Sequence, residues 1–522
     1  MSELAAPADS PPERADLTAW LAVAAGTMGA FMATLDISVV NASLPTIQGE
    51  IGATPAEGTW IGTSYLVAEV IIVPLTAWLE RMLGLRRLLL YSATLFTLFS
   101  MMCGLATSLQ MMILGRIGQG LAGGSLVPTA FTIIATRLPR NQQPVGMALF
   151  GGAALMAPSM GPLLGGWLTE TFSWHYAFFI NLPIGIGMVS LLMIGLPKEK
   201  GDWSELWQAD WVGIAGMIIG LGCFTVLLEE GHRELWFESA LIWKLAIFSA
   251  IGFLMIGWGQ FKARKPVLEL ALLRIPALSA VLIMMLVVGT LLFGISYTTP
   301  QFLAAIAGYN AEQAGQIVFL GGLSAAMMMP IFPTLIARID VRLIVGVGLL
   351  IAAGASYVTS ALTAQSVGSD FIFQQLLMGC GLASVSFSLQ QSAISAVGPD
   401  KAGESSALFM SARNLGGSIG LALIASFQDQ RLHLHRWELH SALDANSLDV
   451  QQRVAATTAQ YGGGPEGLTA AYRMLDGQVI RDALVMSFND ISVMLVIATL
   501  AVIPLVLLLR PLPAGDTPAV MH

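Results

Sequence analysis

Runs of apolar residues long enough to cross a lipid bilayer recur along almost the entire chain. A bilayer core about 30 Å thick requires roughly 20 residues of α-helix. Only 11% of the 522 residues are charged, whereas soluble domains contain about 25%. The sequence therefore predicts an all-α, polytopic membrane protein. We predict fourteen spans, with limits near 19–44, 58–79, 88–107, 111–136, 145–168, 176–196, 210–229, 240–261, 277–300, 315–337, 343–363, 371–396, 404–427 and 490–510.

Lysine and arginine residues are unevenly distributed among the segments that connect these spans. Short cytoplasmic loops carry an excess of basic residues, and one missed helix would invert the pattern beyond it. The short outer loops contain only Arg233. We therefore predict an even number of spans in a bacterial-type inner membrane, with both termini cytoplasmic. The basic residues of the inner segments are Arg14, Arg81, Arg86, Arg87, Arg137, Arg140, Lys198, Lys200, Lys262, Arg264, Lys265, Arg274, Arg338, Arg342, Lys401 and Arg510.

An internal repeat divides the chain into two halves of six spans, with the seventh and eighth spans between them. Parallel half-repeats around a central cavity are typical of transporters. The repeated positions are Gly118, Gly120, Leu121, Ala122 and Ser125 with Gly379, Gly381, Leu382, Ala383 and Ser386, and Gly161 and Gly165 with Gly416 and Gly420. The predicted domains are a cytoplasmic tail at 1–17, an N-terminal bundle at 18–197, two inserted helices at 198–270, a C-terminal bundle at 271–510 and a second tail at 511–522. Residues 428–489 are expected to form an outer loop with short helices lying over the outer face.

Several other function classes are disfavoured. The net charge of −8 argues against nucleic acid as a partner. Residues 118–123 match a dinucleotide-binding pattern, but they lie in an apolar helix with no strand before it. His433 and His435 would face different sides of a helix, which disfavours a metal site with His440. Neither the clustered catalytic set of a membrane-embedded transferase nor the repeated polar ring of a channel is present. We predict no metal, no cofactor and no enzymatic activity.

Few charged residues lie inside the predicted spans: Asp36, Glu69, Arg116 and Arg413, with Lys244 near a membrane edge. Each is costly in lipid and normally faces a partner or a cavity. Helix rise places Asp36 and Arg116 at similar depth, so they could form a structural ion pair or act in function. No cation at the depth of Glu69 is evident. A lone carboxyl group in the middle of the second span favours the role of a proton carrier.

The fifth span combines helix-breaking and small residues. Pro158 and Pro162 interrupt its hydrogen-bond ladder, while Gly161, Gly165 and Gly166 permit a close approach of other helices. Close packing alone explains this composition. A helix that bends and slides at the wall of a cavity explains it equally well.

The chain resembles the fourteen-helix drug:proton antiporters of the major facilitator superfamily, the EmrB/QacA type, over nearly its whole length. The first-helix signature is similar at residues 35–45 (LDISVVNASLP). The fourth-helix motif matches at 116–120 (RIGQG), and its arginine is associated with proton transfer in that family. The fifth-helix antiporter motif matches at 161–166 (GPLLGG). The sixth and thirteenth helices match at 178–185 (FFINLPIG) and 413–420 (RNLGGSIG).

The loop between the second and third spans departs from the family pattern. Ala77 replaces the usual glycine, and Arg81 stands where aspartate is usual. Glu80 is the candidate to take over the role of that acid in the cytoplasmic gate. His175 also stands where arginine is common.

The resemblance implies a major facilitator fold of fourteen helices, arranged 6 + 2 + 6, whose halves rock between inward-open and outward-open states. It implies an antiporter that admits protons and exports amphipathic toxic compounds, with Arg116 associated with proton transfer. From the cost of intramembrane charge we add Glu69 as the carrier of the coupling proton, with Asp36 and Arg116 modulating it. The resemblance also implies a periplasmic adaptor and an outer-membrane channel, with the 428–489 loop as the docking surface. A proton-coupled importer or exporter of a specific metabolite is the alternative. The candidates for substrate binding are Tyr65, Glu69, Tyr297, Gln301, Gln390 and Gln391.

Overall fold

The computed structural model describes residues 14–139, 141–198, 201–262, 267–398, 401–443 and 447–510, which form helices joined by short turns, with no strand among them. The N-terminal half comprises α1 (Leu17–Ile51), α2 (Pro55–Leu83), α3 (Leu85–Gly104), α4 (Leu109–Gly123), α5 (Leu126–Arg137), α6 (Gln143–Thr171), α7 (Tyr176–Phe179) and α8 (Asn181–Gly195). A connecting group comprises α9 (Ser204–Trp207), α10 (Trp211–Gly231) and α11 (Ala240–Lys262). The C-terminal half comprises α12 (Pro276–Ala305), α13 (Ala311–Met327), α14 (Phe332–Arg338), α15 (Val341–Val358), α16 (Gly368–Val397), α17 (Ala402–Ala442), α18 (Leu448–Gln460) and α19 (Gly464–Val502). Short 3₁₀ segments lie at Trp236–Glu238, Leu270–Arg274, Thr359–Ala361 and Ile503–Leu508.

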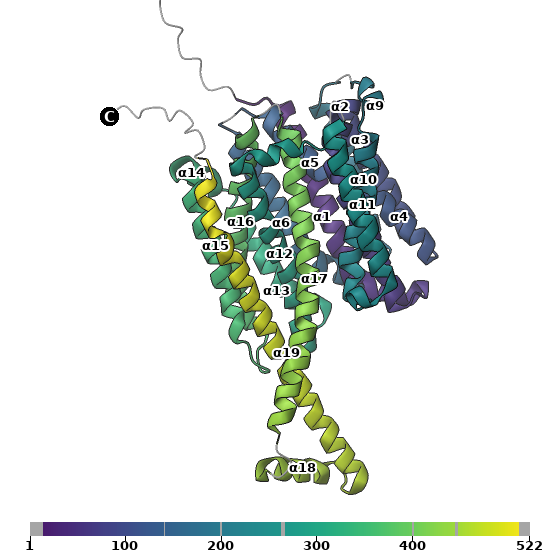
Figure 1. Cartoon of the computed structure of the whole chain (residues 1–522), viewed down its shortest axis with the longest axis vertical. Helices are drawn as coiled ribbons and strands as arrows, with labels where there is room; N and C mark the ends of the chain where they lie inside the picture. The colour runs from purple at the N-terminus through teal and green to yellow at the C-terminus, as the bar shows by residue number, and fades with distance from the viewer. Residues whose placement is uncertain are drawn as a thin grey trace, which may run out of the picture.

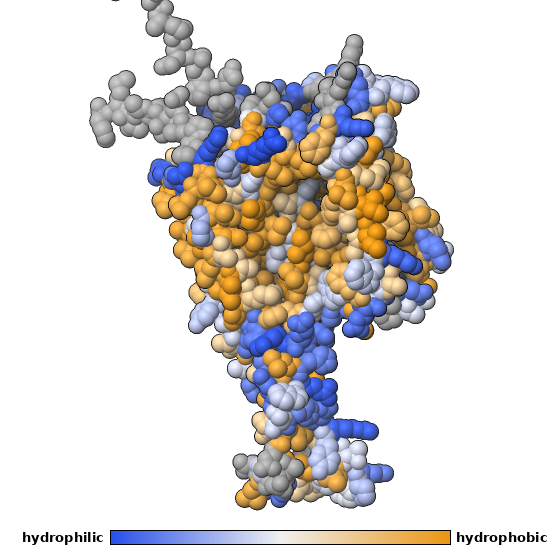
Figure 2. All heavy atoms as spheres, in the orientation of Figure 1, coloured by the Kyte–Doolittle hydropathy of each residue, from blue (hydrophilic) through white to orange (hydrophobic). Residues whose placement is uncertain are grey.

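The apolar surface and the helix lengths agree with a multi-pass membrane protein. Figure 2 shows a broad hydrophobic band across the visible face of the bundle, with many hydrophilic residues at its upper end and on the upper part of the projection below. In the described part of the chain, twelve helices are long and apolar enough to cross a membrane, or thirteen if the bent pair α13–α14 forms one span. The remaining predicted span coincides with α2, a helix of 29 residues that packs against α4, α10 and α17. Fourteen spans are compatible with this arrangement.

Two predicted spans are interrupted. The fourth divides into α4 and α5 at Gly124 and Ser125. The tenth bends by 50° between α13 and α14. Pro330 and Pro333 lie at this bend, and proline both removes a backbone donor and clashes with the preceding turn. Backbone hydrogen bonds continue through both breaks, as from Gly124 N to the Gly120 carbonyl at 3.0 Å and from Phe332 N to the Met328 carbonyl at 2.9 Å.

The expectation of short helices lying over the outer face is wrong for most of residues 428–489. Instead, α17 and α19 continue far beyond the bundle as long helices of 41 and 39 residues, and α18 connects their ends (Figure 1). The sequence from 421 to 442 contains neither glycine nor proline, so nothing interrupts α17 there. We call this projection the stalk. Following the topology predicted from the basic residues, we call the stalk end of the bundle outer and the opposite end inner.

Ion pairs between α17 and α19 hold the stalk together. Arg431 Nε lies 2.5 Å from Asp490 Oδ2 at its base, and Arg436 Nη2 lies 3.1 Å from Asp476 Oδ1 further out. His435 Nε2 also contacts Asp490 Oδ2 at 2.6 Å. These pairs join the two helices directly and stabilise their contact outside the bundle.

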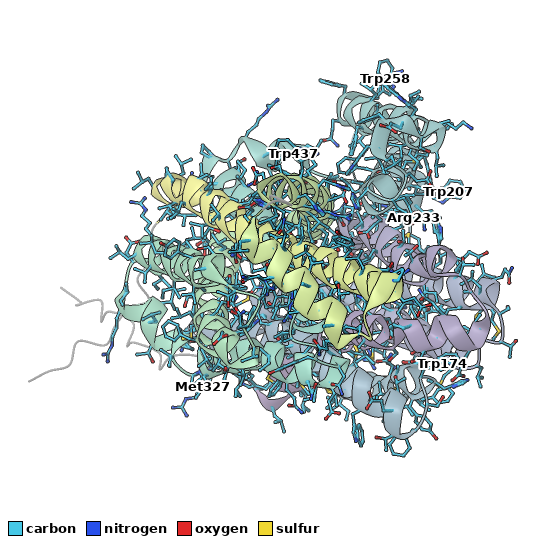
Figure 3. All side chains as sticks on the ribbon, turned by 90° about the horizontal axis from the view of Figure 1, so that it is seen from below. Trp174, Trp207, Arg233, Trp258, Met327 and Trp437 are labelled. Atoms are coloured by element: carbon cyan, nitrogen blue, oxygen red, sulfur yellow. The ribbon has the colours of Figure 1, made fainter. Side chains whose placement is uncertain are left out.

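The two halves meet along two seams. In the first, α6 packs against α13; in the second, α2 and α5 pack against α17. The pair α10–α11 lies outside the second seam, where α10 contacts both α2 and α17. Trp258 of α11 lies at the periphery of the bundle (Figure 3) and is exposed. The same helix pairings occur in both halves. In the N-terminal half α1 packs on α6 and α8, and in the C-terminal half α12 packs on α17 and α19.

Small residues on α4 position the central part of α2. A Cβ atom at Gly120 would lie 2.4 Å from the carbonyl oxygen of Tyr65, and one at Gly124 would lie 2.4 Å from Ile72 Cγ2. Only glycine permits backbones to approach this closely. The approach brings Tyr65 and Glu69 of α2 against the polar residues of α4.

Candidate functional site

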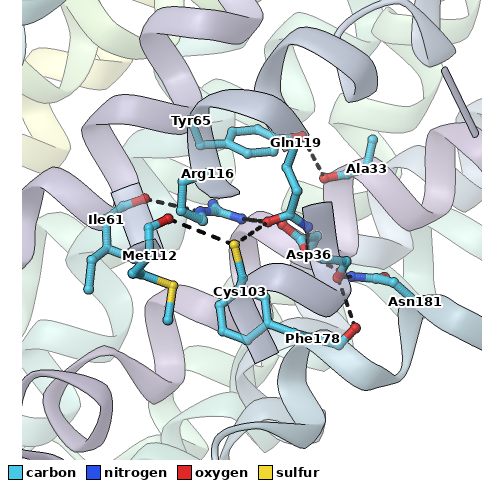
Figure 4. Close-up of polar contacts among 11 residues, drawn as sticks. Ala33, Asp36, Ile61, Tyr65, Cys103, Met112, Arg116, Gln119, Phe178 and Asn181 are labelled. Atoms are coloured by element: carbon cyan, nitrogen blue, oxygen red, sulfur yellow. Dashed lines mark hydrogen bonds and ion pairs between the residues drawn. The ribbon is translucent and has the colours of Figure 1, made fainter. Parts of the chain in front are cut away.

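A buried polar cluster occupies the centre of the N-terminal half (Figure 4). Asp36 of α1 forms an ion pair with Arg116 of α4, and both side chains are fully buried. Gln119 Nε2 and Asn181 Nδ2 donate hydrogen bonds to Asp36 Oδ1 at 3.0 and 2.7 Å. Arg116 Nε donates to the carbonyl oxygen of Ile61 on α2 at 3.0 Å. The carboxylate is therefore neutralised by a cation and satisfied by two further donors, as a buried charge requires.

Neighbouring side chains extend this cluster to five helices. The Arg116 guanidinium lies over the ring of Tyr65 at 4.3 Å, a cation–π contact. The Tyr65 hydroxyl donates to the carbonyl oxygen of Ala33 at 3.4 Å. Ser100 of α3 accepts from Asn181 Nδ2 at 2.9 Å, and Cys103 Sγ donates to Gln119 Oε1 at 3.3 Å. All these residues belong to α1, α2, α3, α4 and α8, so the cluster ties the N-terminal half together.

Helix depth alone predicted that Asp36 and Arg116 could pair, but it did not identify Gln119 or Asn181. Gln119 follows Arg116 by three residues and therefore lies on the same face of α4. Asn181 lies at the start of α8, two residues before Pro183. Both are uncharged polar residues inside apolar spans, and that signal could have found them.

Glu69 lies in a different environment, at the second seam. Its side chain is 8% exposed, and Asn414 Nδ2 of α17 donates to Glu69 Oε1 at 3.2 Å. The residue before Asn414 is Arg413, which is 9% exposed and whose charge acts on Glu69 across the seam. The absence of a cation at this depth, inferred from the sequence, is therefore corrected, because α17 supplies one from the other half. One carboxyl group thus faces a positive charge and an amide across a seam between the halves.

The glycines and prolines of α6 pack against two neighbouring helices, α1 and α13. A Cβ atom at Gly161 would lie 2.1 Å from Ser38 Oγ, and one at Gly165 would lie 2.7 Å from the carbonyl oxygen of Val39, so both glycines face α1. Gly166 faces α13, where its nearest neighbour is the backbone nitrogen of Glu312 at 3.7 Å. Close packing therefore accounts for Gly161 and Gly165 within one half.

The opposite face of α6 forms the first seam. A Cβ atom at Gly315 of α13 would lie 3.0 Å from Pro162 Cβ, and one at Gly322 would lie 2.7 Å from Ser159 Cβ. Pro158 uses its carbonyl oxygen to accept from Ser38 at 2.7 Å. Pro158 also lines a hollow between the halves. The two faces of α6 therefore separate packing inside a half from contact across the seam.

The hollow between the halves, which we call the inter-half cavity, lies among α6, α12, α13 and α16. The wall is mainly apolar, as in most sites for small molecules, with three polar side chains that the sequence analysis did not single out: Ser159, Ser296 and Gln375.

The predicted substrate-binding residues do not converge on one point. Tyr65 belongs to the buried cluster of the N-terminal half, and Glu69 lies at the second seam. Tyr297 is half-buried against the core and Gln301 is exposed, both on α12. Gln390 and Gln391 lie on the inner part of α16, and their side-chain oxygens accept no hydrogen bond within the described structure.

At the inner end, Arg81 of α2 joins three parts of the chain. Its Nη1 lies 2.5 Å from Glu404 Oε1 in the first turn of α17, and its Nε lies 3.6 Å from Glu205 Oε2 of α9. Glu80 accepts from Thr132 Oγ1 of α5 at 3.3 Å. A cation in the N-terminal half and an acid in the C-terminal half therefore meet where the family usually has aspartate.

In the described residues, no group of three or more His, Cys, Asp or Glu side chains could hold a metal ion. Two of the stalk histidines each contact a single acid, and His435 contacts Glu438 as well as Asp490. His433 Nε2 lies 3.6 Å from Asp429 Oδ1, and His440 Nε2 lies 3.1 Å from Asp476 Oδ1.

A multi-pass bundle of two related halves, with a cavity between them and a buried carboxyl group at their seam, is the architecture of a membrane transporter rather than an enzyme. The family model of the Major Facilitator Superfamily matches residues 26–421. The chain belongs to this superfamily, and its resemblance to the EmrB type is confirmed by the relatives described next.

Three relatives extend over nearly the whole chain. Colistin resistance protein EmrB of Acinetobacter baumannii is 31% identical, covering 92% of this chain and 94% of that protein. Multidrug export protein EmrB of Escherichia coli is 28% identical, covering 89% and 90%. Fatty acid resistance protein FarB of Neisseria gonorrhoeae is 27% identical, covering 96% and 98%.

Solved structures share the fold at low sequence identity. The human organic anion transporter MFSD10 (TETRAN) aligns with a TM-score of 0.56 at 15% identity, covering 94% of this chain and 100% of that chain. The proton:xylose symporter XylE aligns with a TM-score of 0.54 at 13% identity, covering 92% and 94%.

Proposed function

We propose that this chain is a proton-coupled antiporter that exports amphipathic toxic compounds across the inner membrane, with both termini in the cytoplasm. The observation that carries the proposal is the position of Glu69 at the seam between α2 and α17, where it accepts a hydrogen bond from Asn414. The relatives named for colistin resistance, fatty acid resistance and multidrug export support an amphipathic substrate class.

In this proposal Glu69 is coupled to movement of the halves because its cation and amide partners, Arg413 and Asn414, lie on the other half and are lost when the second seam opens. A charged carboxylate near the centre of the bilayer costs on the order of 3 kcal/mol or more unless it is paired or hydrated. Protonation from the outer side removes the charge and lets the seam close around a neutral group. Release of the proton toward the cytoplasm restores the charge, which then pairs with Arg413 or with a cationic substrate. Proton and substrate thus exclude each other at one carboxyl group, which gives exchange.

Asp36 and Arg116 support this step indirectly. Arg116 binds the backbone of α2 at Ile61 and the ring of Tyr65, four residues before Glu69. The cluster therefore fixes the helix that carries Glu69. In this proposal the substrate occupies the inter-half cavity. Tyr297, Gln301, Gln390 and Gln391 remain candidates on α12 and α16, two of the helices that line the cavity.

Glu69→Gln tests the proton carrier. The amide mimics the protonated acid, so the variant should be expressed and should bind substrate. Its rate of proton-driven transport should fall about tenfold or more, which corresponds to about 1.4 kcal/mol in the barrier. Substrate-induced proton release and substrate flux are measured together in reconstituted vesicles. Glu238→Gln is the matched control, because Glu238 is an exposed carboxylate in the outer loop after α10. Wild-type transport of every substrate by Glu69→Gln would remove Glu69 from this role and leave Asp36 as the next candidate.

The stalk is the docking surface that we propose for a periplasmic adaptor, which would connect the pump to an outer-membrane channel. Trp437 of α17 is exposed on the stalk (Figure 3). Purification from a Gram-negative host should recover an adaptor with the intact chain, and replacing the stalk with a short linker should prevent that recovery. Isolation of the pump alone with full export activity would instead identify a self-sufficient exporter.

A further inference from the structure

A second hollow lies inside the C-terminal half, among α12, α15, α16 and α19. We call it the hydroxyl hollow. It is located toward the outer end, because Leu362, which follows α15 on that side, also lines it. Phe302 lies between Phe371 and Phe488 in the wall, with ring centroids 5.3 and 5.4 Å apart. The polar groups of the wall are Thr298, Thr299, Ser356, Thr359, Gln374 and Ser492.

Several hydroxyl oxygens in this wall keep free lone pairs after their own hydrogen bonds are made. Ser356 donates to the carbonyl oxygen of Ala352 at 3.2 Å, so its proton points along its own helix. The Thr359 hydroxyl lies 2.9 Å from the Ser356 carbonyl oxygen, and the Ser492 hydroxyl lies 3.1 Å from the Phe488 carbonyl oxygen. These two hydroxyls also lie 3.1 Å from each other, so one can donate to the other. Each hydroxyl oxygen retains lone pairs after making such a bond. The wall therefore brings several oxygen acceptors together around one small space.

Gln374 adds a buried acceptor that has no partner in the described structure. The residue is 1% exposed, and its Oε1 accepts no hydrogen bond within the described structure. A buried acceptor left unpaired costs about 1–3 kcal/mol. The hollow has room for at least one water molecule, and a polar site with several partners is where buried water is found. Water is the small donor that satisfies this geometry, because it can donate twice and also accept.

A single hydrogen bond connects the hydroxyl hollow to the inter-half cavity. Thr299 lines the hollow, Gln375 lines the cavity, and Gln375 Nε2 donates to Thr299 Oγ1 at 3.4 Å. The side chain of Ile295 lines both spaces. Polar groups are therefore continuous from the outer part of the C-terminal half to the space between the halves.

We propose that the hydroxyl hollow is a water-binding site, and that the Thr299–Gln375 bond is the point at which this water communicates with the inter-half cavity. The hollow then forms a lateral path by which water, and protons carried by it, reach the cavity from the outer side. Occupancy by water stands on the geometry alone. Use of the path during transport rests on the proposed function.

Silver ions test the occupancy, because Ag⁺ is small and reacts with thiols that water reaches. In a background with Cys103, Cys223 and Cys380 replaced, single variants Ser356→Cys and Ser492→Cys are exposed to Ag⁺. The thiols left unmodified are then counted with a maleimide after denaturation. The control, Ser125→Cys, replaces a buried serine (1% exposed, against 2% for Ser356 and 9% for Ser492) whose hydroxyl bonds Ser92 in the N-terminal half at 2.6 Å. We expect reaction in the hollow to be at least tenfold faster than at residue 125. Equal, slow reaction at all three positions would show a dry hollow and overturn the proposal; Ser492→Cys decides the matter if Ser356→Cys fails to fold.

Thr299→Val tests the connection. It removes the acceptor of the Gln375 bond with little change in volume, so proton-driven transport should fall severalfold while Ag⁺ still reacts at residue 492. Thr225→Val is the control, because Thr225 is a buried threonine of α10 that bonds only its own helix, at Leu221. Unchanged transport in Thr299→Val would overturn the lateral path. Absence of proton-driven transport in the unmodified protein would overturn the proposed function, while the Ag⁺ result would still decide the occupancy.

Discussion

The two halves use the same place in their bundles in opposite ways. In the N-terminal half, the space among α1, α3, α4 and α8 is filled by the Asp36–Arg116 pair and its amide partners. In the C-terminal half, the corresponding space among α12, α15, α16 and α19 is the hydroxyl hollow, lined by neutral groups. A buried ion pair fixes its surroundings because separating the charges is expensive. The comparison indicates that charges hold this space of the N-terminal half in one arrangement, whereas the corresponding space of the C-terminal half is held by neutral contacts.

The largest effect that this contrast predicts is at Arg116. Arg116→Met removes the cation and leaves Asp36 buried as an unpaired charge, so we expect a loss of about 3–5 kcal/mol in the free energy of unfolding. Adding Asp36→Asn removes the orphaned charge and should recover much of the loss, as a double-mutant cycle would show. Thermal unfolding in detergent, followed by size-exclusion chromatography, measures both. Equal stability of Arg116→Met and the wild type would contradict an arrangement held by charges.

The second prediction concerns a feature that the halves share. A Cβ atom at Gly161 would lie 2.1 Å from Ser38 Oγ, and one at Gly416 would lie 2.0 Å from the carbonyl oxygen of Leu286. Gly161→Ala and Gly416→Ala should therefore each cost about 1–3 kcal/mol through overpacking. Gly166→Ala is the control and should be nearly neutral, because its nearest neighbour is 3.7 Å away. A large loss of thermal stability at residue 166 alone would show that the seam, not the packing inside the halves, limits stability.

The sequence predicted the elements that depend on chain-local physics. Apolar length predicted the helices, the glycine repeat predicted the matching of α6 with α17, and helix rise placed Asp36 at the depth of Arg116. Helix rotation is not encoded in those patterns. The contact of Glu69 with Asn414 could not be predicted, because it depends on how two halves face each other. The hydroxyl hollow could not be predicted either, since it results from the sizes of side chains on four helices. The stalk was missed because polar helices outside the membrane carry no apolar signal, although the lack of glycine and proline after Gly420 was a usable clue.

The third prediction compares two buried glutamines. Gln119 donates to Asp36 and accepts from Arg116 and Cys103 in the sealed cluster, whereas Gln374 Oε1 has no protein donor within the described structure. Gln119→Leu should cost about 1–3 kcal/mol, because it leaves charged partners unsatisfied. Gln374→Leu should change stability by less than about 1 kcal/mol, because only water is displaced. Thermal unfolding of the two variants side by side measures this difference. A larger loss of stability in Gln374→Leu than in Gln119→Leu would contradict the contrast between the Asp36–Arg116 cluster and the hydroxyl hollow.

The smallest effect on stability is expected at the inner end, where the halves touch through partly exposed charges. Arg81 and Glu404 lie 2.5 Å apart with side chains 35% and 14% exposed, and pairs of this kind contribute about 0–1 kcal/mol. Arg81→Glu should therefore leave the melting temperature nearly unchanged. It should nevertheless favour the inward-open state, because like charges at residues 81 and 404 repel across the seam while the interior of each half is untouched.

The exchanged variant, Arg81→Glu with Glu404→Arg, restores attraction between the halves, although Glu205 then faces a like charge at residue 81. Accessibility of a cysteine placed at Gly403, beside this contact, reports the opening: it should rise in Arg81→Glu and fall again in the exchanged variant. If accessibility is the same in all three proteins, the Arg81–Glu404 pair does not hold the inner end closed, and the apolar contacts of α5 with α17 must do so instead.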